Sequence, residues 1–181
     1  MDDLAIRPVR ADEWREVRAL RLSALQDADA AIAFLDSYDD AASRPDEFWQ
    51  QRTAAASIEA GADAVARQFV AVTADGAWVG TLAVLVEHAG ERDFEGMEIR
   101  RSAGGIVGVY VDPEFRGRGV IQPLFDAALD WVRERGLDYA RLYVHTDNSR
   151  ARRAYERAGF RPTGVTVAGS IGLELELARE V

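Results

Sequence analysis

The segment VYVDPEFRGRGVIQPLF (residues 109–125) combines residue types that can bind an anion. An apolar run ends at a turn signal, and Arg116, Gly117, Arg118 and Gly119 then lead into an apolar-patterned helix. A glycine-rich turn at a helix N-terminus directs several unpaired N–H groups the same way, and the helix dipole adds a positive potential. The pattern therefore predicts an anion site. The alternative is a tight strand-to-helix turn with two solvated arginines.

The two commonest nucleotide-binding loops do not fit this segment. A P-loop requires Lys and then Ser or Thr after its last glycine, whereas Val120 and Ile121 follow Gly119. The dinucleotide fingerprint requires a third glycine at the position that Gln122 occupies. We therefore expect a phosphate-bearing ligand of another kind.

Ile121 is bulky and β-branched where a phosphate loop would favour a small residue. It shares helical spacing with Leu124, Phe125 and Ala128, which places it on the apolar stripe of the helix. Pro123 supports a rigid first turn, where a missing N–H is tolerated. We predict that the Ile121 side chain turns inward while its amide still faces the ligand.

The composition favours one globular domain over residues 1–181. Of the 181 residues, 48% are hydrophobic and 29% are charged, so the chain can bury a sizeable core, and two small domains are the less favoured alternative. The chain has no cysteine, and His88 and His145 are its only histidines. Disulfides, a cysteine nucleophile and zinc sites built on thiolates or three histidines are therefore excluded, and no metal is expected.

The charge and the hydropathy limit the partners. A formal charge of -9 argues against nucleic acid, because phosphate backbones require clustered Lys and Arg, and it is easier to reconcile with a cationic or neutral acceptor. No segment approaches the roughly 18 to 20 consecutive apolar residues of a membrane span, and the start, MDDLAIRPVR, lacks the pattern of a signal peptide. We expect a cytoplasmic protein without nucleic-acid or membrane partners.

Periodicity and turn signals predict a single mixed sheet in an α/β or α+β fold. The expected strands cover residues 4–10, two arms of a hairpin within 67–87, 104–111, 140–146, 162–167 and 171–178. The expected helices cover residues 12–25, 43–56, 121–135 and 149–158. Residues 27–43 are expected to form a mobile or partly helical connection, and residues 88–103 a long hairpin loop. In the last strand, Leu173, Leu175 and Leu177 alternate against Glu174 and Glu176.

A second motif occupies the next predicted strand and helix, LYVHTDNSRARRAYERAGF (142–160). Its key residues are Asn148, Ala151, Tyr155, Gly159 and Phe160. Together with YVDPEFRGRGV, it resembles the paired acyl-CoA binding segments of the GNAT superfamily of N-acyltransferases, in the same order. The first segment of that family reads Gln or Arg, two residues, Gly, one residue, then Gly or Ala; Arg116 and Gly119 match, and Ile121 departs. The opening IRPVRADEWREVRALRLSAL is also similar, so the resemblance covers nearly the whole chain.

The resemblance implies a mostly antiparallel central sheet of about seven strands, flanked by about four helices and splayed between the fourth and fifth strands. It implies that acyl-CoA binds through the backbone of Val109, Tyr110 and Val111, the amides of Arg116, Gly117, Arg118, Gly119, Val120 and Ile121, and the side chain of Asn148. Tyr155 would stand near the sulfur as general acid to the leaving thiolate. The alternative for Tyr155 is an aromatic residue on the buried stripe of its helix.

The implied reaction is direct transfer of an acetyl group from acetyl-CoA to a primary amine of a small molecule or peptide-like acceptor. An alkylamine with a pKa of about 10.4 is protonated at neutral pH, so a proton acceptor or a desolvating pocket is required. A backbone N–H near Val109 can stabilise the oxyanion, and no covalent enzyme intermediate is needed. The strand 104–111 has no carboxylate, which leaves Glu98, His145 or a water chain open as the base.

The rival interpretation is a non-catalytic acyl-CoA binding or regulatory domain of the same fold, suggested by the missing carboxylate and by Ile121. A module without any CoA site is a third alternative. The aspartate-rich stretch with Phe34 and Tyr38, and the loop 88–103, lie where relatives shape the acceptor pocket, so a cationic amine is preferred. Acyl chain length, acceptor identity and the choice between a monomer and a homodimer stay open.

Overall fold

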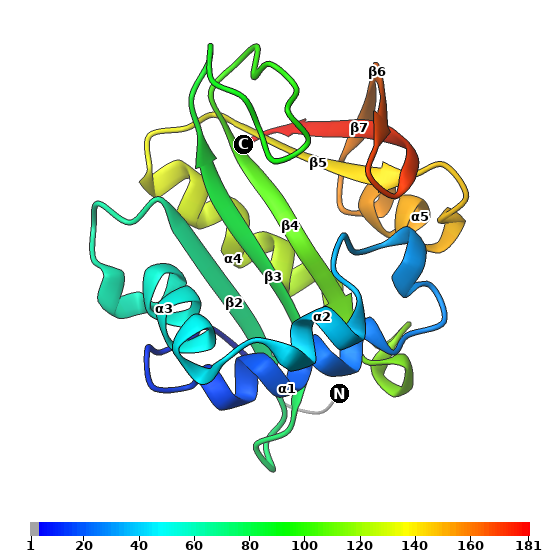
Figure 1. Cartoon of the computed structure of the whole chain (residues 1–181). Helices are drawn as coiled ribbons and strands as arrows, with labels where there is room; N and C mark the ends of the chain where they lie inside the picture. Colours follow the sequence, from blue (N-terminus) through cyan, green and yellow to red (C-terminus); the bar gives the residue numbers. More distant parts are fainter. Residues whose placement is uncertain (1–3) are drawn as a thin grey trace.

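Seven strands form one sheet in the order β1-β2-β3-β4-β5-β7-β6 in the computed structural model, which describes residues 4–181 (Figure 1). The strands are β1 (Ala5–Pro8), β2 (Ala66–Val72), β3 (Trp78–Glu87), β4 (Ala103–Val111), β5 (Tyr139–His145), β6 (Arg161–Gly169) and β7 (Gly172–Glu180). Every neighbouring pair is antiparallel except β4 and β5, which are parallel. The predicted mixed, mostly antiparallel sheet is confirmed.

Helices cover both faces of the sheet (Figure 1). They are α1 (Trp14–Leu25), α2 (Tyr38–Ser43), α3 (Asp46–Ala56), α4 (Ile121–Glu134) and α5 (Ser149–Arg157). Phe125 of α4 and Tyr155 of α5 share one apolar cluster with Leu82 of β3, whereas Val17 of α1 and Trp49 of α3 share a second cluster on the other face. No helix within residues 4–181 is long and apolar enough to cross a membrane.

The connection between α1 and α3 contains α2, a helix that the sequence analysis did not predict as a separate element. Residues 27–43 form a short 3-10 turn (Ala30–Ile32) and then α2, where the Ser37 hydroxyl accepts a hydrogen bond from the Asp40 amide at 3.1 Å. Asp36 ties this connection to its neighbours through Arg21 at 3.0 Å and Arg44 at 2.9 Å. The connection is therefore partly helical, as predicted, and five helices replace the four expected.

Strand β4 contains a one-residue bulge at Gly108 and Val109, where the register against β3 shifts by one residue. Gly108 has a φ of 63°, which glycine adopts without the steric cost that other residues incur. The extra residue reverses the alternation of side chains, so Ile106 packs with the α4 cluster while Tyr110 packs with the α1 cluster. The bulge therefore moves the side chains of the second half of β4 to the opposite faces of the sheet.

The sheet opens between β4 and β5. These strands pair only at Gly104 with Ala140 and at Gly105 with Arg141, and their carboxyl ends diverge (Figure 1). β1 to β4 thus form one half of the sheet, and β5, β7 and β6 form the other. The predicted splay between the fourth and fifth strands is confirmed.

A buried ion cluster joins the two halves near the point where they meet; we call it the Arg141 cluster. The Arg141 guanidinium donates to Glu87 at 2.6 Å, Asp93 at 2.8 Å, Glu176 at 2.9 Å and the Tyr143 hydroxyl at 2.7 Å. Asp93 belongs to the long β3–β4 connection of the first half, and its side chain is fully buried. The cluster therefore anchors this connection on β5 and β7.

Candidate acyl-CoA and amine site

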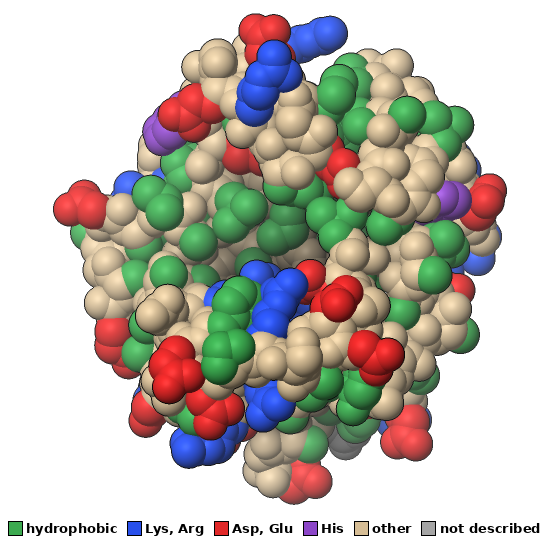
Figure 2. Space-filling model, viewed as in Figure 1, with side chains coloured by type: hydrophobic (Ala, Val, Ile, Leu, Met, Phe, Trp, Pro, Cys, Tyr) green, Lys and Arg blue, Asp and Glu red, His purple; other side chains and the backbone are tan. Residues whose placement is uncertain are grey.

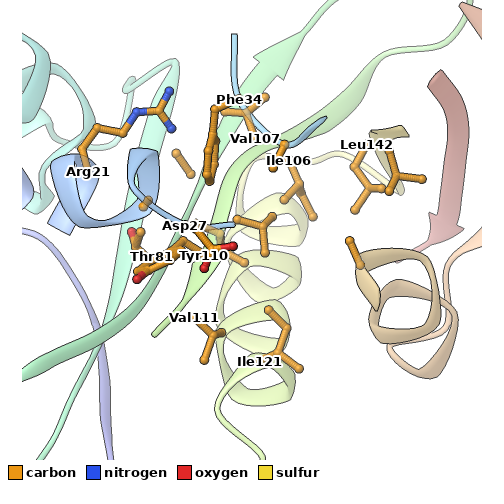
Figure 3. Close-up of a pocket in the computed structure, with 18 of the residues that line it drawn as sticks. Arg21, Asp27, Phe34, Thr81, Ile106, Val107, Tyr110, Val111, Ile121 and Leu142 are labelled. Atoms are coloured by element: carbon orange, nitrogen blue, oxygen red, sulfur yellow. The ribbon is translucent and has the colours of Figure 1, made fainter. Parts of the chain in front are cut away.

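A cavity of about 1240 Å³ lies where β4 and β5 diverge, and Figure 2 shows it as a hollow with hydrophobic side chains along its wall. Its lining comes from the helices α1, α3, α4 and α5, from the strands β2, β3, β4, β5 and β7, and from connections that include residues 27–36, Arg44 and the loop before α4. Figure 3 shows Arg21 and Phe34 on one side and Ile121 and Leu142 on the other. We call these the arginine end and the loop end.

The loop end presents free backbone amides. Gly117 and Gly119 have φ values of 75° and 83°, and a Cβ at either residue would meet no other atom within 4 Å. Glycine is therefore required here for its backbone conformation, not for space. The first N–H groups of a helix have no acceptor within it, and the amides of Gly119, Val120 and Ile121 find none elsewhere in residues 4–181. These amides and the α4 dipole suit an anionic ligand.

The two arginines of this loop present less to the cavity than their sequence suggested. The Arg116 side chain donates to the Val111 carbonyl at 2.9 Å and forms an ion pair with Asp27. Arg118 lies outside the lining, with its guanidinium over the Phe115 ring at 5.5 Å. The guanidinium of Arg116 thus holds the loop against the end of α1.

Ile121 turns inward only in part. It is half-buried, packs against the α4 cluster and lines the cavity, whereas Val120 is 2% exposed. The reason is that the centre of the buried stripe runs through Val120, Leu124 and Ala128, which leaves Ile121 at its border. Ile121 therefore serves as a wall of the cavity as well as a core residue.

The remaining backbone positions predicted to bind the cofactor lie on β4. Val109 and Val111 are half-buried, Tyr110 is buried, and all three line the cavity beside the bulge. Because a bulge leaves a residue of the strand outside the regular ladder, it offers backbone groups to a ligand that regular pairing would occupy. The geometry agrees with an N–H donor near Val109.

Asn148 and Tyr155 reach the cavity from the start and the middle of α5. The Asn148 Oδ1 accepts a hydrogen bond from the Ala151 amide at 3.1 Å and caps the helix, while its Nδ2 donates no hydrogen bond within residues 4–181. The Tyr155 ring packs edge-to-face on Phe125 at 5.7 Å and also lines the cavity. Burial raises the pKa of Tyr155 above its usual range, so the phenol stays protonated.

The three candidates for the base fare differently. Glu98 is exposed and lies outside the cavity lining. His145 is 9% exposed and lines the cavity, and its Nδ1 accepts a hydrogen bond from the Asp147 amide at 3.1 Å. The third candidate, a water chain, stays a prediction. Of the two side chains that the sequence analysis considered as the base, His145 lines the cavity and Glu98 does not.

Glu174 of β7 is a cavity residue that the sequence analysis assigned no role. It is 5% exposed, and its Oε2 has no hydrogen-bond partner within residues 4–181. Burial, reinforced by the charge of Glu95, raises the pKa of Glu174 to about 7. The other cavity carboxylates, Asp27 and Asp36, are both paired with arginines. A buried carboxyl group with a raised pKa in a cleft is a frequent sign of acid–base chemistry.

Among relatives, the chain is 47% identical to a mycothiol acetyltransferase of Beutenbergia cavernae over 64 residues, which are 35% of this chain and 22% of that protein. It is 36% identical to the mycothiol acetyltransferase of Clavibacter sepedonicus over 94 residues, 50% of this chain and 31% of that protein. The matched segments thus span less than a third of these relatives' own lengths.

The fold recurs in solved structures and the family model fits most of the chain. A paia N-acetyltransferase from Thermoplasma acidophilum in complex with coenzyme A has a TM-score of 0.72 at 16% identity, covering 99% of both chains. The model of the acetyltransferase (GNAT) family matches residues 14–160. With its two motifs, its sheet order and this match, the chain belongs to the GNAT acetyltransferase family.

Proposed function

We propose that this protein transfers the acetyl group of acetyl-CoA directly to a primary amine. The observation that carries the proposal is one continuous cavity that joins the free amides before α4 to the opening between β4 and β5. A pyrophosphate requires such amides, and an extended acyl-pantetheine arm requires such an opening. Membership in the GNAT family supports the same activity.

The residues of the loop end fit acetyl-CoA, which supplies an activated acetyl thioester when bound. The amides of Gly117, Gly119, Val120 and Ile121 would hold the pyrophosphate, because they point from a glycine-rich turn and from the positive end of α4. The backbone of residues 109–111 and the Nδ2 of Asn148 would hold the arm.

Glu174 is our choice for the proton acceptor. A base that works near neutral pH needs a pKa near the operating pH, and the buried carboxyl group of Glu174, at about 7, meets that condition. It would take the proton of the incoming ammonium group, directly or through water. His145, which pairs with Glu174 in the β5–β7 register, is the alternative acceptor.

Tyr155 is our choice for the proton donor. A tyrosine phenol, with an ordinary pKa of about 10, is neutral at physiological pH. Burial raises the pKa of Tyr155 further, which keeps the proton on the phenol and makes it a weaker acid, and its ring packs on Phe125. A neutral, fixed phenol can donate a proton to a departing thiolate. Glu174 and Tyr155 thus give the cavity an acceptor and a donor on different elements.

Replacing Glu174 by Gln tests the proposal. In an assay of CoA thiol release with a panel of amines, the wild type should turn over, and its kcat/KM should rise with pH through about 7 as Glu174 ionises. Glu174→Gln should lower kcat by roughly a hundredfold or more and flatten that limb of the profile. Glu98→Gln, at an exposed position outside the cavity, is the matched control and should leave both unchanged.

Stability provides a second readout of the same residue. Because the pKa of folded Glu174 lies above the ordinary value of 4.5, ionisation of this group costs stability as pH rises from 4.5 to about 7. Glu174→Gln should remove that loss.

Saturable acetyl-CoA binding without thiol release from any amine would instead favour the non-catalytic binding domain. Absence of any binding would leave the fold without a CoA site.

Two expectations stay predictions under this proposal, a cytoplasmic location and a single functional domain over residues 1–181, and the choice between a monomer and a homodimer stays open.

A further inference from the structure

Three arginines gather at the arginine end of the cavity, each from a different part of the chain. Arg21 lies on α1, Arg44 directly follows α2, and Arg52 lies on α3. Figure 2 shows basic side chains along one edge of the hollow, and Figure 3 shows the Arg21 guanidinium beside Phe34. A protein with a formal charge of -9 therefore places positive charge at the end of the cavity that lies away from its phosphate loop.

The nearby carboxylates do not balance this charge. Among the residues that the structure describes, Asp36 is the only acidic side chain lining this end of the cavity, and it pairs with both Arg21 at 3.0 Å and Arg44 at 2.9 Å. No carboxylate within residues 4–181 forms an ion pair with Arg52. One negative charge thus faces three positive ones.

The surroundings make the excess costly. Burial lowers the pKa of Arg21, whose side chain is 17% exposed, whereas Arg52 is exposed, so water partly screens its charge. The Arg21 Nε is buried without a hydrogen-bond partner within residues 4–181. Charges that are removed from water without compensation destabilise a fold, and an anion bound among them would relieve this cost.

Two rings hold the cluster in place. The Arg21 guanidinium lies over the Phe34 ring at 4.5 Å, and the Arg44 guanidinium lies over the Phe48 ring at 4.5 Å. Such contacts fix the planar groups and leave their N–H edges for hydrogen bonds. Fixed guanidinium forks match the two oxygens of a carboxylate.

We propose that the acceptor is a primary amine that also carries a carboxylate, and that the cluster of Arg21, Arg44 and Arg52 binds this carboxylate while the amine faces the opening between β4 and β5. The proposal rests on the proposed acetyl transfer. It reverses the preference for a cationic acceptor that the overall charge suggested, because the local charge of the cavity, not the net charge of the chain, meets the substrate. The three arginine side chains of the cluster do not compete with the substrate amine for the acetyl group, because their guanidinium groups stay protonated and are not nucleophiles.

Matched amines test the proposal in the thiol-release assay. β-Alanine, propylamine, ethylenediamine and phosphoethanolamine share an aminoethyl group and end in a carboxylate, a methyl, an ammonium and a phosphate; ε-aminocaproate, hexylamine and hexamethylenediamine form a longer series. The carboxylate member of at least one series should exceed its neutral partner in kcat/KM by on the order of tenfold, with the diamine lowest. Neutral amines or diamines equal to the carboxylates would overturn the proposal, and a preference for phosphoethanolamine would replace carboxylate by phosphate.

Variants of Arg52 assign the effect to this cluster. Arg52→Gln should lower kcat/KM for the carboxylate amine by on the order of tenfold, mainly through KM, and leave the neutral amine unchanged. Arg52→Glu should favour the diamine. Arg15→Gln, an exposed arginine of α1 outside the cavity, is the control and should change nothing. An equal loss for all amines in the Arg52 variants would mean that Arg52 supports the fold alone.

A binding arm separates this proposal from the proposed function. With CoA present, calorimetric titration should show that N-acetyl-β-alanine binds more tightly than N-propylacetamide, and that Arg52→Gln abolishes the difference. Failure of every amine to release thiol would overturn the acetyl transfer. Equal binding of the two amides would overturn the carboxylate site, whether or not thiol is released.

Discussion

At the scale of single residues, Tyr155 serves the core and the cavity together. Its ring has the helical spacing of a buried stripe, which explains its position without any chemistry, yet the same ring borders the cavity beside Asn148. The structure therefore does not require a choice between the two roles. Only removal of the hydroxyl, with the ring left in place, separates them.

Tyr155→Phe should keep the packing and remove the proton donor. We expect kcat to fall by roughly a hundredfold with little change in acetyl-CoA affinity, because the phenol acts on the leaving thiolate and not on binding. Steady-state kinetics and calorimetry measure the two quantities. Tyr38→Phe, at an exposed position outside the cavity, is the control. An unchanged rate constant for the chemical step in pre-steady-state measurements would assign Tyr155 to the core alone.

The motif residues could be found from the sequence, but Glu174 could not. Alternation in the last strand correctly placed Leu175 and Leu177 toward the core, yet Leu173 is 50% exposed while Glu174 is 5% exposed. The face that alternation assigned to the glutamates is not open to water. The β3–β4 connection covers it, with Glu95 beside Glu174 and Asp93 beside Arg141. Contacts so distant in the chain leave no local signal.

At the scale of elements, the turn before α4 depends on two glycines in left-handed conformations. The amides of Arg116 and Arg118 donate to carbonyls within the loop, whereas those of Gly119, Val120 and Ile121 have no acceptor within residues 4–181. The sequence predicted this turn and its helix, since glycine and the apolar stripe are local signals. It did not predict the bulge in β4, although a lone glycine within a strand often marks one. The bulge decides which face Tyr110 occupies.

Gly119→Val should all but abolish CoA binding. The φ of 83° at this position is strained for any side chain and worst for a β-branched one, so the amides before α4 would turn away from the ligand. Calorimetric titration with CoA measures the loss. Gly76→Val is a matched control, because Gly76 has a similar φ of 89° in a turn outside the cavity. It should lower stability and leave CoA affinity unchanged, and equal affinity in both variants would contradict the assigned phosphate site.

At the scale of the whole molecule, the sheet consists of two halves that share little backbone pairing. Only two residue pairs connect β4 to β5, and the Arg141 cluster and the apolar side chains of α4 add contacts between the two halves. The sequence indicated the splay only through its family resemblance. The charges that bridge it were not predictable, because Glu87 and Arg141 lie in different predicted strands and Asp93 in the predicted loop 88–103, and nothing local to any of them indicates the other two.

Arg141→Met should destabilise the protein by about 3 to 5 kcal/mol, because it leaves buried carboxylates, including Asp93, without a cation. Urea denaturation at neutral pH measures the change. Arg101→Met removes ion pairs with Asp138 and Glu180 that also bridge the two halves, but at an exposed site, and should change stability far less. Similar losses in both variants would show that burial does not distinguish the two bridges.

The divided sheet also has a consequence for how the chain is partitioned. The first half uses only residues 5–111 and the second only residues 139–180, so the polypeptide crosses between them once, through the loop 112–120 and α4. Each half is therefore an uninterrupted length of chain, and the cavity is the seam between two consecutive segments. A molecule bound in that seam touches both segments and acts as a non-covalent cross-link. Two fragments divided at the loop 112–120 would accordingly associate more tightly when CoA is present than when it is absent.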